Sequence, residues 1–127
     1  MKTILVDAVF CFVLDRGEIF TEMHELLESF PNKKIILTGA NDEQFVKFGL
    51  DIMPYEVFTL KHNPEKTDPA YFKTLLSKYN LTNQDVVYFE HNIDAVKSAE
   101  SVGIKSYFYD ENIKDLIGLK EFITNNI

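Results

Sequence analysis

Residues 4–13 of the chain read ILVDAVFCFV: an apolar run leads into a single carboxylate, Asp7, and a second apolar run follows. A short continuous apolar run is typical of a strand that is buried on both faces of a parallel sheet. In such sheets, ligands bind at the carboxyl ends of the strands. The stretch therefore leaves two interpretations of Asp7, a catalytic group or only a polar residue that ends a strand.

The same alternation of short apolar runs and longer amphipathic ones continues along the chain. The runs KIILTG (34–39), YEVFTL (55–60), DVVYFE (85–90) and KSYFYD (105–110) predict four further strands, and helices are expected over residues 18–30, 41–50, 68–80, 93–103 and 113–124. This alternation predicts an α/β fold, with a mostly parallel Rossmann-like sheet between two layers of helices. No linker, repeat or low-complexity tract interrupts it, so residues 1–127 are expected to form one domain.

Signals for helix ends support this interpretation. Asp68 and Pro69 suit an N-cap and a first helical position, and Asn41 or Asp42 suits the N-cap of an earlier helix. Gly103 is a natural helix stop.

Composition bounds the function. The chain has 46% hydrophobic residues, 13 basic against 20 acidic side chains, and a formal charge of -7. An acidic chain lacks the basic footprint that nucleic-acid or anionic-membrane binding requires. No apolar run reaches the roughly 18 residues of a spanning helix. Asp7 interrupts the apolar N-terminus, which disfavours the alternative of a signal peptide, and the expected location is the cytoplasm.

Cys11 is the only cysteine, so no disulfide can form within the chain. It lies in an apolar run, and we expect it to be buried and inert.

Three carboxylates lie at or just after predicted strand ends: Asp7, Glu90 and Asp94. Mg²⁺ prefers oxygen ligands and binds through a few carboxylates together with a substrate phosphate. A magnesium site is therefore one hypothesis for this edge of the sheet. The alternative is that Asp7 is only a solvated turn residue. Glu90 and Asp94 would then simply lie near a helix N-terminus, where the helix dipole favours acidic side chains.

Thr38, Gly39 and Lys66 add the features of an anion site. A hydroxyl and accessible backbone N–H groups at a strand-to-helix turn suit an anion, and lysine supplies a compact positive charge. Together with a nucleophilic carboxylate, these groups indicate phosphoryl transfer through an aspartyl-phosphate. Taken singly, Thr38 is typical of turn chemistry and Lys66 of an exposed loop.

The order of these residues resembles the four motifs of the haloacid dehalogenase-like (HAD) superfamily, most of whose members are Mg²⁺-dependent phosphatases. The matching stretches are ILVDAVFCF, IILTGAN, EKTDPAYF and VVYFEHNIDAVKSAESVGI, within roughly residues 2–110. The resemblance implies a sheet order of five-four-one-two-three, with the Asp7 strand in the centre. It implies Asp7 as nucleophile, Thr38, Gly39 and Lys66 as the phosphate site, and Mg²⁺ held by Asp7, the backbone carbonyl of residue 9, Glu90 and Asp94.

The first motif departs from the family pattern. The resemblance implies a second aspartate at position 9 that protonates the leaving group and later activates water, but the chain has Val9. Loss of a general acid/base typically costs about 10²- to 10⁴-fold in rate. Phe10 and Cys11 replace the family's glycine and threonine, and Glu90 replaces the usual aspartate. His91, beside Glu90, is an alternative acid or base.

The spacing between motifs also leaves no room for the cap domain that many family members carry. The resemblance then implies an open site, suited to a large phosphorylated substrate, to a protein partner, or to coverage by another copy of the chain.

Three functions remain open at this point. The first is an impaired Mg²⁺-dependent phosphatase that acts through an aspartyl-phosphate. The second is a catalytically inactive HAD-like domain used for binding or interaction. The third is a haloacid dehalogenase, which also has a residue other than aspartate at the position of Val9 but needs a cap-borne arginine; Arg16 is the only arginine.

Overall fold

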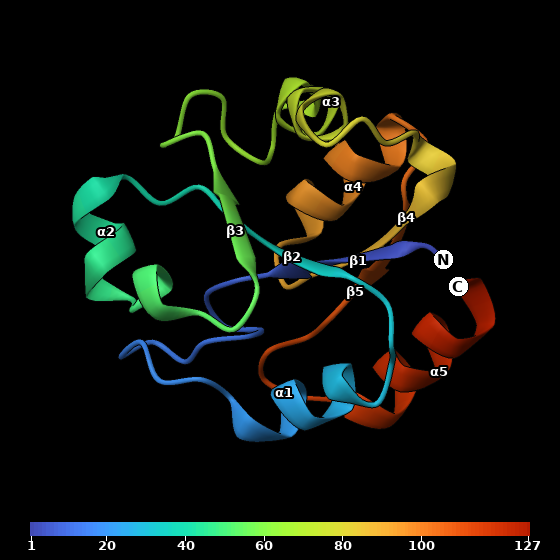
Figure 1. Cartoon of the computed structure of the whole chain (residues 1–127), viewed down its shortest axis with the longest axis horizontal. Helices are drawn as coiled ribbons and strands as arrows, with labels where there is room; N and C mark the ends of the chain where they lie inside the picture. The colour runs from blue at the N-terminus through green and yellow to red at the C-terminus, as the bar shows by residue number, and fades with distance from the viewer.

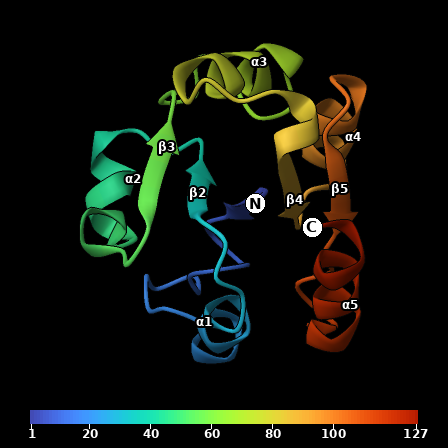
Figure 2. The same ribbon diagram turned by 45° about the vertical axis from the view of Figure 1, so that its right-hand side comes forward.

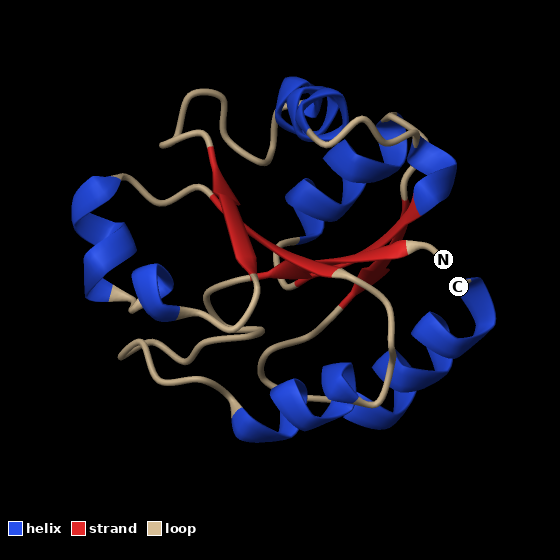
Figure 3. Cartoon of the chain, viewed as in Figure 1, coloured by secondary structure: helices blue, strands red, loops and turns tan.

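The apolar runs form the strands of a single parallel sheet, and the computed structural model describes residues 1–127 around it (Figures 1 and 3). The strands are β1 (Thr3–Asp7), β2 (Lys34–Thr38), β3 (Glu56–Thr59), β4 (Val86–Glu90) and β5 (Lys105–Phe108). Their order is β3-β2-β1-β4-β5, and all four pairings are parallel. This is the predicted order read from the opposite edge, and it confirms that the strand ending at Asp7 is central.

Helices cover both faces of the sheet. Figure 1 shows α1 (Thr21–Glu28) and α5 (Leu116–Asn126) on one side, and α3 (Pro69–Lys78) and α4 (Ile93–Ser101) on the other. The short α2 (Asp42–Lys47) and the 3₁₀ turn η1 (Leu50–Ile52) lie beside β3, as the rotated view in Figure 2 also shows, and a second 3₁₀ turn, η2 (Asn83–Asp85), precedes β4. The architecture is the predicted three-layer sandwich, and no cap domain is evident.

Two apolar clusters hold these layers together. Side chains alternate across a strand, so Ile4 and Val6 of β1 pack into the cluster under α1 and α5, whereas Leu5 packs into the cluster under α3 and α4. Every residue of β1, β2 and β4 is buried. Burial on both faces explains why these strands have continuous apolar runs rather than alternating ones.

The predicted helix ends agree with the structure. The side chain of Asp68 accepts a hydrogen bond from the backbone N–H of Ala70 at 2.9 Å, with Pro69 as the first residue of α3. Asn41, not Asp42, caps α2 through a reciprocal pair of hydrogen bonds with Gln44. Gly103 follows α4 with a φ of 85°, a conformation that glycine adopts without strain.

The helix expected over residues 18–30 is shorter than predicted and begins at Thr21. Residues 18–20 instead turn back on residues 12–14. The N–H of Leu14 donates to the carbonyl of Glu18 at 2.8 Å, and the N–H of Phe20 donates to the carbonyl of Phe12 at 2.8 Å. These hydrogen bonds hold residues 18 and 20 against an earlier segment of the chain, so the helix begins only at Thr21.

The two ends of the chain lie close together, because Lys2 Nζ donates to the backbone carbonyl of Asn126 at 2.8 Å. No helix combines the length and the apolar character that crossing a membrane requires.

Candidate functional site

A cavity of about 210 Å³ lies at the carboxyl ends of the central strands β1 and β2. Asp7, Thr38 and Glu90 are the last residues of β1, β2 and β4, so the parallel sheet brings their side chains to one edge. The cavity is lined by Asp7, Val9, Thr38, Gly39, Ala40, Gln44, Phe48, His62, Lys66 and His91. Five of the predicted site residues therefore line one cavity.

Lys66 bridges two buried carboxylates. It belongs to the loop before α3, and its Nζ lies 2.6 Å from Oδ1 of Asp7 and 2.8 Å from Oε1 of Glu90. Both carboxylates are almost fully buried, and only 15% of the Lys66 side chain is exposed. Buried carboxylates require a partner of opposite charge, and Lys66 serves both.

His91 approaches Asp7 from the other side. Its Nδ1 contacts Oδ2 of Asp7 and lies 3.2 Å from Oε2 of Glu90, and its backbone N–H also donates to Oδ2 of Asp7 at 3.2 Å. The buried thiol of Cys11 lies 3.4 Å from the same Oδ2. Three protein groups thus surround one oxygen of Asp7, while Lys66 contacts the other.

These neighbours shift the pKa values of Asp7 and His91. Burial alone would raise the pKa of Asp7, but the charge of Lys66 and the hydrogen bond from His91 outweigh it and hold this pKa well below its usual range. Burial opposes the charge on His91 too, yet its contacts with Asp7 and Glu90 raise its pKa to about 10. Asp7 is therefore ionised, and Nδ1 of His91 carries the proton that it shares with Oδ2.

Cys11 responds in the opposite sense. Burial, followed by the charges of Asp7 and Glu90, raises the pKa of its thiol well above the usual value. In this arrangement the thiol is protonated and donates to Asp7, so it does not act as a nucleophile.

Glu90 is held by its own surroundings as well as by Lys66. The hydroxyl of Tyr88 donates to Oε1, and the backbone N–H of Asn92 donates to Oε2 at 3.1 Å. The longer side chain that replaces the family's aspartate is thus fixed at the base of the site.

Thr38 and Gly39 form one wall of the cavity. Oγ1 of Thr38 accepts a hydrogen bond from the N–H of Ala40 at 3.1 Å, and the hydroxyl of Tyr71 donates to the Thr38 carbonyl at 2.7 Å. A Cβ at Gly39 would lie 3.3 Å from Nδ1 of His62. The absence of a side chain at Gly39 lets this histidine approach the wall of the cavity.

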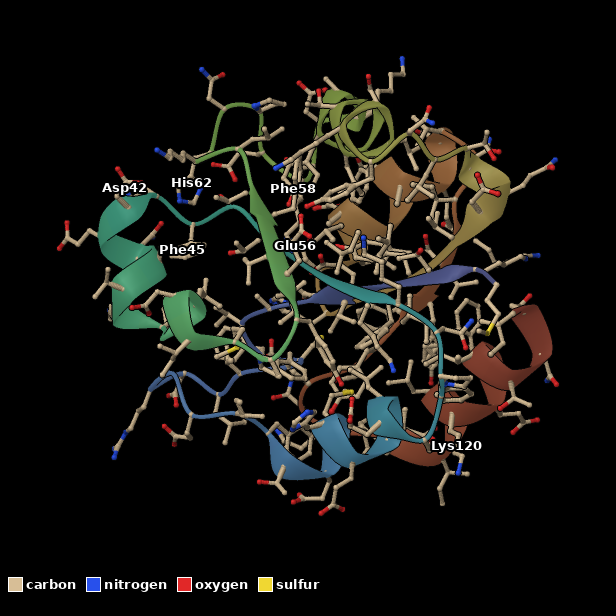
Figure 4. The ribbon with its side chains drawn as sticks, viewed as in Figure 1. Asp42, Phe45, Glu56, Phe58, His62 and Lys120 are labelled. Carbon is tan, nitrogen blue, oxygen red and sulfur yellow. The ribbon has the colours of Figure 1, made fainter.

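His62 is a cavity residue that the sequence did not single out. Its Nε2 lies 2.5 Å from Oε1 of Gln44, and its Nδ1 lies 2.9 Å from Oε1 of Glu65. Figure 4 shows His62 beside the start of α2, where Asp42 lies. No motif pointed to this position, because the loop after β3 meets α2 only in the folded chain.

Val9 lines the cavity where the resemblance implies an acid, and it offers no proton. The turn that follows β1 nevertheless keeps a glycine-like backbone. Phe10, at the family's glycine position, has a φ of 73° and is 40% exposed, with its ring in edge contact with His91 at 5.3 Å between centroids. A bulky residue in this region is strained. The phenyl ring does not line the cavity.

Asp94 is not part of the cluster. It lies in the first turn of α4, is exposed, and does not line the cavity. Its own N–H is capped by the side chain of Asn92 at 2.9 Å. The structure therefore brings Asp7 and Glu90 together without their predicted third carboxylate.

The donor set does not fit the magnesium ion that the resemblance implies. Mg²⁺ requires an octahedral shell of oxygen ligands. Around Oδ2 of Asp7 the nearest groups are instead a nitrogen of His91 and the sulfur of Cys11, and Asp94 lies outside the group. The other oxygen of Asp7, Oδ1, and Oε1 of Glu90 are already paired with the charge of Lys66.

Comparison with known proteins extends only to solved structures. No protein-family model matches the sequence, and no curated protein matches it. A HAD family enzyme from Bacteroides thetaiotaomicron matches with a TM-score of 0.69 over 85% of this chain and 93% of that one, at 13% identity. That enzyme is an aspartate-to-alanine mutant in complex with magnesium and inorganic phosphate. The chain has the HAD fold.

Two further structures agree with this assignment of the fold. The core domain of a candidate phosphoglycolate phosphatase from Streptococcus pneumoniae matches at TM-score 0.56 and 22% identity, over 83% of this chain and 77% of that one. An uncharacterised protein from Corynebacterium glutamicum matches at TM-score 0.62 and 14% identity, over 98% and 96% of the two chains.

Sequence reasoning undervalued two residues that contact Asp7, Cys11 and His91. Cys11 was expected to be inert, and His91 was only an alternative acid or base. The sequence did hint that both lie near the site, because Cys11 is four residues after Asp7 and His91 directly follows Glu90. The N–H of Phe12 donates to the carbonyls of Asp7 and Ala8, at 3.2 and 2.8 Å, and this turn brings the thiol back over Asp7.

Proposed function

We propose that the chain is an impaired phosphatase that accepts a phosphoryl group on Asp7 and releases it slowly. The observation that supports this proposal is an ionised carboxylate, paired with Lys66, at the floor of an open cavity. Thr38 and Gly39 on the cavity wall supply a hydroxyl and backbone groups for the phosphoryl oxygens. The HAD fold, which a structure with bound phosphate shares, adds to this support.

The first step needs only groups that the chain contains. Oδ1 of Asp7 attacks phosphorus, the bond between phosphorus and the leaving oxygen breaks, and the leaving group departs with the electron pair. Lys66, which contacts Oδ1, offsets part of the charge on the phosphoryl oxygens. Val9 donates no proton, so the leaving group has to be stable as an anion, as in an aryl or acyl phosphate.

The second step is the slow one. Hydrolysis of the aspartyl-phosphate requires a base to take a proton from water, and Val9 offers none. His91 lies on Oδ2, and its Nδ1 already carries a proton that it donates to this oxygen. We therefore expect the phosphorylated form of Asp7 to accumulate.

The test uses p-nitrophenyl phosphate with the wild-type chain and with Asp7→Asn, each in Mg²⁺ and in EDTA. We expect an initial burst of p-nitrophenolate, a slow steady rate, and an intact-protein mass increased by one phosphoryl group. The asparagine variant should show none of these. Wild-type behaviour equal to that of Asp7→Asn would refute the proposal.

A second candidate is a domain that binds phosphorylated ligands or a protein partner without chemistry. It is favoured by the charge balance of the cluster, in which Lys66 and His91 offset Asp7 and Glu90. A wild-type chain that binds inorganic phosphate in an NMR titration, yet is never phosphorylated, would establish this candidate over the first. A dehalogenase is not proposed, because Arg16 is exposed and does not line the cavity.

A further inference from the structure

Three side chains with different ligand atoms converge beside the cavity. One atom each from Asp7, Cys11 and His91 lies within 4.8 Å of the other two, and Sγ of Cys11 is 3.4 Å from Oδ2 of Asp7. Ligands at about 2.0 to 2.3 Å from a tetrahedral zinc ion lie roughly 3 to 4 Å from one another. A small outward shift of the three side chains would therefore admit an ion between them.

The backbone holds these residues in place before any ion binds. The turn after β1 returns Cys11 to the side of Asp7, and the backbone N–H of His91 donates to Oδ2 of Asp7. Cys11 and Asp7 are buried, and 23% of the His91 side chain is exposed. Residues fixed in this way lose little conformational freedom when a metal binds.

We propose that Asp7, Cys11 and His91 bind a transition-metal ion of the zinc class. Sulfur, imidazole nitrogen and carboxylate oxygen together suit Zn²⁺ or Co²⁺ and do not suit Mg²⁺. Asp7 and His91 line the cavity, so an ion bound to them would be reached from it and could keep a fourth position for an outside ligand. Three protein ligands and one open position form the arrangement of a catalytic rather than a structural zinc site.

The charge of the cluster also suits a divalent ion. Asp7 and Glu90 place two buried carboxylates there, with Lys66 against both. Binding of Zn²⁺ requires a deprotonated thiol, so it would release the proton of Cys11.

Tyr109 supplies a further observation. Its hydroxyl is buried and has no hydrogen-bond partner, and the residue belongs to the same apolar cluster as Cys11. An unpaired buried donor is costly. Because it packs in the apolar cluster that contains Cys11, it is a candidate donor to a metal-bound thiolate.

The test is a Co²⁺ titration of the reduced, metal-free chain, followed by displacement with Zn²⁺ and by calorimetry. We expect one ion per chain, a near-ultraviolet band from thiolate-to-cobalt charge transfer, and intense visible bands of a tetrahedral ion. Excess Mg²⁺ should not displace the cobalt. This measurement involves no turnover, so its outcome is independent of whether Asp7 accepts a phosphoryl group.

Three variants assign the ligands. Cys11→Ser should lose the charge-transfer band, and His91→Gln should weaken binding by more than the roughly 10- to 100-fold that a lost second-shell partner costs. His62→Gln, which removes a histidine from the same cavity without touching the three ligands, should leave affinity and spectrum unchanged. Circular dichroism confirms that each variant is folded.

Three outcomes would overturn the proposal. The first is a wild-type spectrum without a thiolate band, and the second is no binding at all. The third is an affinity that falls with His62→Gln but not with Cys11→Ser or His91→Gln.

Discussion

Lys66 Nζ lies 2.6 Å from Oδ1 of Asp7, although 59 residues separate the two in the chain. The same nitrogen lies 2.8 Å from Oε1 of Glu90. Removing one partner from a buried ion pair is strongly destabilising, because it leaves an uncompensated charge in the protein interior. This single contact therefore links the stability of the fold to the chemistry of the site.

We expect Lys66→Met to lower the free energy of unfolding by about 3 to 5 kcal/mol. The matched control is Lys61→Met. Lys61 lies 3.0 Å from Oδ1 of Asp42, with side-chain exposures of 61% and 87%, and a pair of this kind is worth at most about 1 kcal/mol. Urea denaturation of both variants measures the difference. Equal losses in the free energy of unfolding would show that the buried carboxylates do not depend on the charge of Lys66.

Val9→Asp should restore the missing proton donor. If the rest of the site can act on a phosphate ester, turnover of p-nitrophenyl phosphate should rise by about 10²- to 10⁴-fold, the usual contribution of a general acid/base. The control is Val9→Asn. Asparagine has nearly the same shape as aspartate but cannot donate a proton as an acid, so this variant should turn over at the wild-type rate. A folded Val9→Asp chain with no gain in turnover would favour the binding domain.

Phe10 should be a site of stored backbone strain. Its φ of 73° is a left-handed conformation, which costs a residue with a side chain roughly 1 to 2 kcal/mol. Phe10→Gly removes this strain at the cost of a more flexible unfolded chain, whereas Phe10→Ala keeps the strain and loses the ring. We expect the glycine variant to be more stable than the alanine variant by about 1 kcal/mol in thermal or urea unfolding. The opposite order would contradict the strained turn.

The pH dependence of stability follows from the raised pKa of His91. In the metal-free chain this pKa moves from 6.5 to about 10. A raised pKa means that the folded state holds the proton more tightly than the unfolded one. The stabilisation by His91 is then fully present below pH 6.5 and is lost as the pH rises toward about 10.

We therefore expect the stability difference between wild type and His91→Gln, measured in EDTA, to shrink between pH 6.5 and 10. An NMR titration of the His91 ring should show the same range directly. A ring that titrates near 6.5 would mean that the contacts with Asp7 and Glu90 do not hold it.

Most of the architecture could be predicted because its causes are local. Burial on both faces makes β1, β2 and β4 continuous apolar runs, and Asp68, Pro69 and Gly103 mark helix ends through their own backbone and side-chain chemistry. The main error, a helix expected from residue 18, arose because residues 18–20 hydrogen-bond to residues 12–14. The spacing of apolar residues within 18–30 cannot reveal a pairing with residues outside that segment.

The candidate site, too, was predictable only where its causes are local. The sequence by itself determined that Asp7, Thr38 and Glu90 end their strands, because an apolar run stops where a polar side chain must leave the core. Only the tertiary structure decided what those residues contact. It placed Lys66 between two carboxylates, brought His91 to Asp7 across 84 residues, and left Asp94 outside. Such distant contacts depend on strand order and loop paths, which local residue patterns do not specify.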